Sequence, residues 1–321
     1  MGYAVVLGEA LIDLLEGQCG GEPVFRPAVG GAPLNVAVGV ARLGGAVEFV
    51  GSLGDDGLAG RIRDLLSTAG VGMRGTITTT APTALAVATF AGAEPDFRFY
   101  GDPPSYALLE PQALDAELVS AAAVLYCGSI ALLHPGPLAA AREAWSRTGG
   151  LRVFDPNVRP RLLTGPDAVT ELRSVVAEFA ADADVVKLSS ADAEVLYPAT
   201  SVRQAADRLL DLGARTVVLT CGAAGALVAT GAGSAMLPAP EVRAVDATGA
   251  GDSVMAALIA DLLADGVPED LAGWTHRVGY ALQVAGLVCE SPGGAVAMPT
   301  REQVAARFAG PPSGSSGTDD R

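Results

Sequence analysis

The fold is decided by the stretch Val245-Asp246-Ala247-Thr248-Gly249-Ala250-Gly251-Asp252, which runs directly into the apolar residues 253–263. Its small residues predict a tight turn that leads into a helix. The N–H groups of the turn and of the helix start would then approach an anion closely. These groups belong to Gly249, Ala250 and Gly251.

Asp252 stands at the junction of this turn and the expected helix. A carboxylate is a common N-cap of a helix, which is one interpretation. Its charge would also repel a phosphate bound at the turn. The second interpretation therefore makes it a general base that takes a proton from a hydroxyl. After it, Val254, Leu258 and Leu262 recur every four residues, which predicts one apolar stripe on the helix.

A second motif, Gly30-Gly31-Ala32-Pro33-Leu34-Asn35, lies far upstream and opens another expected helix. Pro33 suits the first turn of a helix, and Gly44-Gly45 suits its end. A tight turn into a buried helix accounts for the glycines, but it does not account for Asn35.

In this order, the two motifs resemble the signatures of the ribokinase-like carbohydrate kinases. The likeness continues through residues 49–57 and covers roughly residues 4–300. It implies that Asp252 is the catalytic base and that the amides of residues 249–251 form the anion hole. It also implies a sugar pocket lined by Gly30, Gly31 and Asn35.

Apolar strand patterns alternate with helical patterns along the chain, which predicts a mostly parallel sheet layered between helices. The resemblance implies the same α/β class, as a ribokinase-like α/β/α domain with a small β-sheet lid. The expected strands are 4–7, 47–50, 123–127, 152–154, 185–188 and 217–220, and the expected helices include 168–180 and 202–212.

Two segments, 10–28 and 83–101, interrupt this alternation. Each contains a turn, and the second has the pattern of a hairpin with its turn at 92–96. In the family such segments form the lid over the sugar and are often shared with a second subunit, so a homodimer through the lid is expected. Residues 1–310 are expected to form one sugar-kinase domain, and the composition of 311–321 predicts a disordered tail.

The resemblance places three further residues at the sugar. Asp13, at the end of the strand region 11–13, would bind sugar hydroxyls, although a surface acid would look the same in sequence. Arg159 belongs to Asp155-Pro156-Asn157-Val158-Arg159-Pro160, which resembles an element of the fructokinase and 2-keto-3-deoxygluconate kinase branch. It would bridge sugar and γ-phosphate, and the alternative is an exposed arginine in a turn. Tyr100 lies on the expected lid strand.

The resemblance also assigns the nucleotide to the turn Thr220-Cys221-Gly222-Ala223-Ala224-Gly225. There Thr220, Gly222 and Gly225 would approach the phosphates and ribose of ATP. A plain hairpin turn is the alternative. Residues 280–283, expected near adenine, lack the Asn that is common in the family.

Metal ions are implied by the resemblance as well. The family organises Mg²⁺ through water with an Asn-x-x-Glu element, which appears here as Ser189-Ser190-Ala191-Asp192. Asp192 keeps a carboxylate with a shorter reach, so Mg²⁺ would be held mostly by phosphates and water. Asp246 and Thr248 match positions whose oxygens often bind a monovalent cation such as K⁺.

Composition excludes several other classes of protein. The net charge of −15 argues against nucleic acid as a partner, because phosphate backbones need Lys and Arg patches. Lys187 is the only lysine, and no Gly-Lys-Ser/Thr string is present, which excludes an ordinary P-loop kinase. The first strand leads into Gly8-Glu9-Ala10, which disfavours a Rossmann dehydrogenase.

The sequence also indicates where the protein is located. No apolar run is long enough for a membrane span, so no membrane partner is expected. The four widely spaced cysteines predict free thiols rather than disulfides or a zinc site. With no signal-peptide pattern at the start, a cytoplasmic protein is expected.

Together these observations predict an ATP-dependent sugar kinase whose partners are a sugar and ATP. Fructose is the first candidate. Gly101 stands where related keto-acid sugar kinases often carry an Arg after the lid Tyr, and losing that cation disfavours a carboxylate substrate. The alternatives are 2-keto-3-deoxygluconate kinase, then ribokinase or a nucleoside kinase. A non-catalytic member of the fold that binds sugar or a protein partner is the alternative from a different class.

Overall fold

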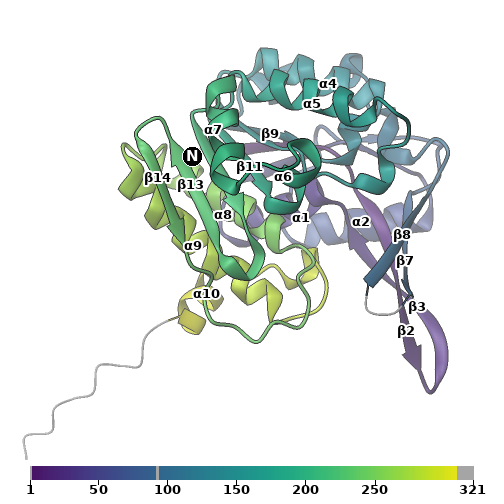
Figure 1. Cartoon of the computed structure of the whole chain (residues 1–321). Coiled ribbons are helices and arrows are strands. Elements are labelled where there is room, and N and C mark those ends of the chain that lie inside the picture. The colour runs from purple at the N-terminus through teal and green to yellow at the C-terminus, as the bar shows by residue number, and fades with distance from the viewer. Residues whose placement is uncertain (1, 92–93, 309–321) are drawn as a thin grey trace, which may run out of the picture.

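An eight-stranded sheet forms the centre of the computed structural model, which describes residues 2–91 and 94–308 (Figure 1). Its strands from β12 to β4 run parallel, and β13 and β14 are added antiparallel at one edge. The carboxyl ends of six strands therefore meet along one edge of the sheet. The order is β14 (Gly233–Leu237), β13 (Ala226–Thr230), β12 (Thr216–Thr220), β11 (Val185–Ser189), β10 (Leu151–Asp155), β9 (Val124–Gly128), β1 (Ala4–Leu7) and β4 (Val47–Val50).

Helices cover both faces of this sheet, and each face has its own buried apolar cluster. The strands are almost wholly apolar because both of their faces are covered, as in β1, where all four residues are buried. One face carries α1 (Ala32–Arg42), α2 (Gly57–Thr68), α8 (Ala250–Asp265), α9 (Leu271–Cys289) and α10 (Arg301–Phe308). The other carries α3 (Ala116–Ser120), α4 (Pro135–Arg147), α5 (Ala168–Ala180), α6 (Ser190–Leu196) and α7 (Val202–Leu212).

This layered arrangement confirms the predicted α/β class. The predicted strands are all present to within a residue at either end, and the two helices predicted at 168–180 and 202–212 have those bounds. In α7 a capping box forms between Ser201 and Gln204, and Gly213 ends the helix with a φ of 126°. The remaining short elements are β5 (Ser52–Leu53), β6 (Ile77–Thr78) and the 3₁₀ turns η1 (Ser105–Leu108), η2 (Pro111–Ala113), η3 (Ile130–Leu133), η4 (Pro160–Leu162), η5 (Gly222–Ala224) and η6 (Ala295–Ala297).

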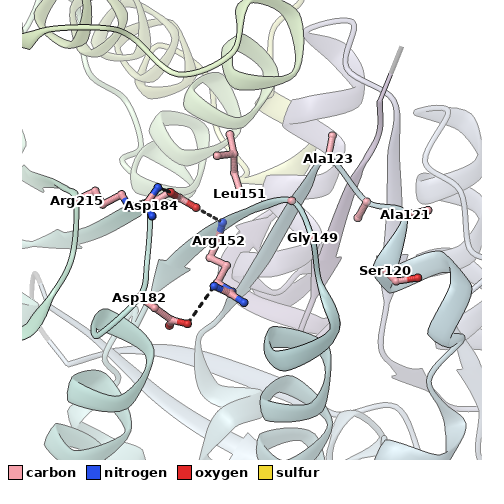
Figure 2. A pocket seen from close by; sticks show the side chains of 11 residues that line it. Ser120, Ala121, Ala123, Gly149, Leu151, Arg152, Asp182, Asp184 and Arg215 are labelled. Atoms are coloured by element: carbon pink, nitrogen blue, oxygen red, sulfur yellow. Dashed lines mark hydrogen bonds and ion pairs between the residues drawn. The ribbon is translucent and has the colours of Figure 1, made fainter.

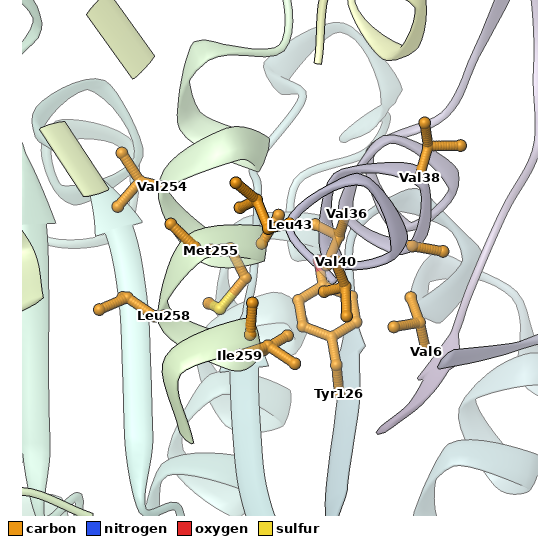
Figure 3. Packing of buried hydrophobic residues seen from close by; sticks show 14 of the residues in the cluster. Val6, Val36, Val38, Val40, Leu43, Tyr126, Val254, Met255, Leu258 and Ile259 are labelled. Carbon is orange, nitrogen blue, oxygen red and sulfur yellow. The ribbon is translucent and has the colours of Figure 1, made fainter. Parts of the chain in front are cut away.

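Helix α8 differs from the sequence prediction in two ways. Its N-cap is Gly249, in the left-handed conformation, and Asp252 is the third helical residue rather than the N-cap. The prediction of a single apolar stripe was wrong, because every residue from Asp252 to Leu262 is buried. Helices α1 and α9 and strand β9 all contact α8, so it has no face left for solvent. Figure 3 shows Met255 and Ile259 of α8 on the side of the helix that faces Val40 of α1 and Tyr126 of the sheet.

The two segments that interrupt the alternation, 10–28 and 83–101, form a separate four-stranded sheet that projects from the main body (Figure 1). Asp13 is the third residue of β2 in this sheet, so it does not end the strand region 11–13 as the sequence suggested. The turn predicted at 92–96 was also too long, because the second strand of that hairpin already begins at Glu94. The sheet order is β3 (Glu22–Gly30), β2 (Leu11–Cys19), β7 (Leu85–Ala91) and β8 (Glu94–Tyr100). The tail predicted at 311–321 lies outside the described residues.

Candidate active site

The side chain of Asp252 lies against Asn35 at the carboxyl edge of the main sheet. The Nδ2 of Asn35 donates a hydrogen bond to Asp252 Oδ2 at 2.7 Å, and the two residues are only 5% and 7% exposed. They come from α1 and α8, which pack closely because Gly39 lets Ala256 approach. A Cβ on Gly39 would stand 2.5 Å from the Ala256 Cβ. Close helix packing thus joins the two sequence motifs at one carboxylate.

Asn35 also has an unused acceptor. Its Oδ1 is buried and has no hydrogen-bond partner among the described residues. A buried acceptor without a partner costs free energy, and a hydroxyl group of a ligand would satisfy it. This is the place where the sequence puts a sugar.

The segment after β10 supplies a second contact to Asp252. Asn157 donates from Nδ2 to Asp252 Oδ1 at 3.4 Å, and its own Oδ1 accepts from Arg159 Nη1 at 2.5 Å. Asn157 has a φ of 38°, a left-handed conformation that a non-glycine residue adopts rarely. The sequence motif pointed to Arg159, but the residue that contacts Asp252 is Asn157. The only sequence signal for Asn157 is its position between Asp155 and Arg159.

The charge of Asp252 is balanced by several neighbours. Burial raises its pKa, while Lys187, Asn35 and Arg159 lower it, and the net shift is upward. A carboxylate whose pKa is raised, and which nearby cations and amides still stabilise as an anion, has the properties of a general base. Lys187 had been singled out in the sequence only for its rarity, and the structure places it near this site.

The glycine pair Gly30-Gly31 has a steric explanation. A Cβ on Gly30 would lie 2.0 Å from Asp13 Oδ2, and one on Gly31, which has a φ of 111°, would lie 2.7 Å from the carbonyl oxygen of Glu9. The two glycines therefore leave room for the Asp13 carboxyl and for the chain that crosses behind it. Burial raises the pKa of Asp13 to about 6, an effect that the guanidinium of Arg159 opposes.

Glu9 is a site neighbour that the sequence reasoning missed. It is buried two residues after the end of β1, and its Oε2 accepts a hydrogen bond from the Ala131 N–H at 3.2 Å. Burial raises its pKa to about 7, while hydrogen bonds and the charge of Arg159 lower it. An acid following four buried apolar residues was the available signal.

The turn before α8 leads into the N-terminus of this helix, which carries Asp252 in its first turn. Position 249 requires glycine, because its backbone is left-handed and a Cβ there would stand 2.8 Å from the Cα of Gly294. The N–H of Ala250 donates to the carbonyl of Ala247 at 3.1 Å, so it reaches a phosphate only if that bond opens. Gly251 lies in the first turn of the helix, where N–H groups have no intrahelical partner.

The turn expected near the nucleotide connects β12 to β13 at the same sheet edge. Thr220 ends β12 beside β11, with its Oγ1 at 3.5 Å from the Leu188 carbonyl oxygen. Gly222 and Gly225 have φ values of 56° and 97°, and a Cβ on Gly225 would stand 1.9 Å from the carbonyl oxygen of Leu237. Both glycines are therefore explained by the backbone of the turn, and their contact with a nucleotide stays a prediction.

The residues predicted at metal ions already have partners in the chain. Asp192 accepts hydrogen bonds at Oδ1 from the Val158 N–H and at Oδ2 from Ser189, and Asp246 accepts from the N–H groups of Thr248 and Gly293. Among residues 2–91 and 94–308 no group of three or more His, Cys, Asp or Glu side chains is arranged to hold a metal ion. These donors fit a Mg²⁺ ion held by phosphates and water, and they do not form a protein cage for it.

The remaining predicted residues lie on the lid and on helix α9. Tyr100 ends lid strand β8 opposite Leu85 and is 54% exposed. Residues expected near adenine, Tyr280, Leu282 and Gln283, line a cavity of about 850 Å³ beside the end of β14.

Another cavity, of about 710 Å³, lies at the opposite, amino-terminal edge of the main sheet (Figure 2). Its charged side chains already pair with one another, Arg152 with Asp182 at 3.1 Å and Arg215 with Asp184 at 2.9 Å. Ligands of parallel sheets bind at the carboxyl edge, where Asp252 and Asn35 lie. We therefore place the candidate site at that edge.

No helix within the described part of the chain is long and apolar enough to cross a membrane.

Comparison with known proteins gives a consistent set of relatives. The model of the pfkB family of carbohydrate kinases matches residues 1–301. The probable fructokinase-3 of Arabidopsis thaliana is 37% identical over 208 residues, which are 61% of this chain and 58% of the relative. The probable fructokinase-4 of the same plant is 32% identical over 317 residues, 94% of both chains. The match to the first of these relatives thus spans less than two thirds of its length.

Solved structures show the same likeness. The fructokinase of Xylella fastidiosa with bound ATP superposes with a TM-score of 0.86 at 29% identity, over 95% of this chain and 97% of the other. The aminoimidazole riboside kinase of Salmonella enterica, complexed with aminoimidazole riboside and an ATP analogue, has a TM-score of 0.83 at 28% identity, over 96% and 100% of the two chains.

Proposed function

The chain belongs to the pfkB family of carbohydrate kinases, and from this premise we propose that it is an ATP-dependent sugar kinase with fructose as its acceptor. The contact of Asp252 with Asn35 carries the proposal. It puts a buried carboxylate, held as an anion by two amide side chains, in the first turn of a helix whose N-terminus favours phosphate.

In the proposed reaction, Asp252 takes the proton of a sugar hydroxyl as its oxygen attacks the γ-phosphorus of ATP. The new oxygen–phosphorus bond forms as the bond from the γ-phosphorus to the bridging oxygen breaks, and ADP leaves with that electron pair. The amides at Gly249 and Gly251, and that of Ala250 once its bond to the Ala247 carbonyl opens, stabilise the charge that spreads over the transferring group. Mg²⁺ bound to the nucleotide would neutralise phosphate charge, with Asp192 reaching it through water.

Sugar binding is assigned to residues of the lid sheet and of the main body. Asp13 and the free Oδ1 of Asn35 accept hydrogen bonds from sugar hydroxyls. The positive charge of Arg159 lowers the pKa of both Asp13 and Asp252, so its guanidinium lies near both carboxyl groups. Tyr100 would cover the sugar when the lid is closed. Thr220, Gly222 and Gly225 face the nucleotide at the end of β12.

Fructose is preferred because the lid lacks a cation at one position. Gly101 has a φ of 126°, and a Cβ there would lie 3.1 Å from the Cα of Pro104, so this backbone does not suit an arginine. Without that charge a neutral sugar binds better than a sugar acid. The similarity to an aminoimidazole riboside kinase keeps a riboside as the second candidate.

The test is an ADP-release assay with fructose, ribose, 2-keto-3-deoxygluconate and nucleosides. Turnover with fructose at the highest kcat/KM supports the proposal, and a riboside in that place makes the second candidate correct. Tight binding of one sugar without any turnover would instead favour a non-catalytic member of the fold. Asp252→Asn should reduce kcat by at least about 10³-fold, while calorimetry still detects sugar binding. Near-normal turnover in that variant would remove Asp252 from the role of base.

Three further parts of the proposal concern cations, assembly and location. K⁺ would bind near Asp246 and Thr248, and replacing K⁺ with Na⁺ in the assay tests that site. A homodimer through the lid is supported by two exposed aromatic side chains on it, Phe25 and Tyr100. The cytoplasmic location stays a prediction from sequence.

A further inference from the structure

We propose that Lys187, acting through Asp155 and Asn157, positions the base Asp252 and keeps it charged, an inference that rests on the proposed kinase function. Lys187 is the only lysine of the chain. It is buried in β11, only 2% exposed, and the reaction described above gives it no task.

A continuous series of hydrogen bonds leads from this lysine to the base. Lys187 Nζ donates to Asp155 Oδ2 at 2.8 Å, and Asp155 Oδ1 accepts from the Asn157 N–H at 3.0 Å. The Nδ2 of Asn157 then donates to Asp252 Oδ1 at 3.4 Å. The other carboxyl oxygen of Asp252 is held by Asn35. Both oxygens of the base are therefore oriented by amide groups, and the residue that carries one of these amides is linked to the lysine through Asp155.

The segment in the middle of this series is held from a second side. Asp192 Oδ1 accepts from the Val158 N–H at 2.9 Å, and its Oδ2 is bonded to the backbone and hydroxyl of Ser189 at the start of α6. The left-handed backbone of Asn157 is thus held between Asp155 and Asp192. Such a conformation costs free energy and persists only where surrounding contacts enforce it.

The positive charge of Lys187 also acts on the ionisation of Asp252. Asp155 is fully buried, and a buried ion is tolerated only when it is paired and hydrogen-bonded. Burial lowers the pKa of Lys187, but Asp155, Asp192 and Asp252 together raise it above its usual value, so the amine stays cationic. That cation is the largest of the influences that lower the pKa of Asp252, after the opposing effect of burial. The charged or titratable groups that act on or respond to Asp252 are Asp13, Tyr126, Asp155, Arg159, Lys187 and Asp192.

The position of the amine suits a supporting role. A Cβ on Gly251 would stand 3.0 Å from Lys187 Nζ, so the amine lies directly beside the backbone of the first turn of α8. It is enclosed there together with Asp155 and is not part of the surface that a substrate meets. We therefore describe Lys187 as a positioning residue.

The first experiment measures the base itself. Carbon-13 NMR titration of aspartate carboxyls, with the Asp252 signal assigned by its loss in Asp252→Asn, is performed on the whole protein and on Lys187→Met. The midpoint for Asp252 should rise by about one pH unit or more in Lys187→Met, because a cation is removed beside it. An unchanged midpoint overturns the proposal, and this readout does not depend on finding the correct sugar.

The second experiment uses turnover. In Lys187→Met, kcat should fall about 100-fold and the acid limb of its pH profile should move to higher pH, with KM for ATP within about threefold of the unaltered protein. A KM for ATP that rises more than about tenfold with an unmoved acid limb would make Lys187 a phosphate ligand and overturn the positioning role. Lack of turnover in the unaltered protein would count against the proposed function alone, since the NMR titration stands without it.

Two further variants keep the test decisive. Asn157→Gly breaks the series without removing a charge from the core, and glycine accepts the φ of 38° at no steric cost. Its kcat should fall as in Lys187→Met, and full activity would overturn the proposal even if Lys187→Met does not fold. Arg215→Gln removes a positive charge at the opposite edge of the sheet, where it pairs with Asp184, and should change neither kcat nor the acid limb.

Discussion

Gly30 leaves the space that the carboxyl group of Asp13 occupies in the lid. Close approaches of this kind decide which side chains meet at the site. The sequence singled out Gly30, Asn35 and Asp252 because their motifs are distinctive. It could not show that Asn35 bonds directly to Asp252, since that contact depends on how two distant helices pack. Glu9 was missed for the same reason, because its burial is set by the neighbouring turn after β9.

Replacing this glycine tests the role of Asp13. In Gly30→Ala the new Cβ would stand 2.0 Å from Asp13 Oδ2, so the carboxyl must move away from the sugar. We expect KM for the sugar to rise about tenfold or more, as for the loss of one good hydrogen bond to a charged group. Steady-state kinetics measures it, and an unchanged KM would show that Asp13 does not bind the sugar.

The buried acid Glu9 predicts a pH dependence of stability. Its pKa is about 7 in the folded chain against 4.5 as a free side chain, so the folded state holds the proton more tightly. The free energy of unfolding therefore falls as pH rises from 4.5 to about 7, by about 3 kcal/mol for this group.

Glu9→Gln removes this titration while keeping an acceptor for the Ala131 N–H. Urea unfolding should find the variant close to the unaltered protein at pH 4.5, and more stable than it at pH 8. A difference between the two proteins that does not grow with pH would show that Glu9 is not held in its neutral form.

At the scale of elements, local sequence signals predicted where helices and strands begin and end. They did not predict which neighbours cover each element. The capping box at Ser201 and the glycine at Gly213 fix α7 from sequence alone. The apolar pattern of α8 predicted one buried stripe, but α1, α9 and β9 together cover the whole helix. The spacing of apolar residues predicts the buried face of a helix only when another face is exposed to water.

The packing of α1 on α8 can be tested at Gly39. A Cβ there would meet the Ala256 Cβ at 2.5 Å and push the helices apart. Gly39→Ala should lower the free energy of unfolding by about 1 to 3 kcal/mol. Its kcat should fall more than its KM changes, because Asn35 and Asp252 lie on the two separated helices.

Gly60→Ala is the matched control. Gly60 lies in the interior of α2, and a Cβ there meets nothing within 4 Å. This variant should gain up to about 1 kcal/mol from helix propensity. A loss in both variants alike would mean that close packing of α1 on α8 is not the cause.

The whole molecule consists of a main sheet layered between helices, one of which carries the base, and a small projecting sheet that carries Asp13 (Figure 1). The parallel order of the main sheet was predictable, because apolar strands alternate with helices. The register of the lid was not, since β2 pairs with β3 and also, in parallel, with the distant β7. That second pairing brings together segments that no local signal connects.

The lid also makes a prediction about assembly. Phe25 is 48% exposed on its edge strand β3, which would suit contact with a second copy. Sedimentation should show a dimer, and Phe25→Asp should shift it toward the monomer without unfolding it. A monomer in the unaltered protein at high concentration would contradict the proposed dimer.

The burial of the single lysine has a practical consequence for anyone who handles this protein. Reagents that acylate primary amines find no lysine on the folded surface, because Lys187 is enclosed beside α8. Its acylation requires the surrounding core to open, so the rate of labelling at residue 187, followed by mass spectrometry, reports how often that core opens. The same side chain that positions the base thus serves as a probe of how often the core opens.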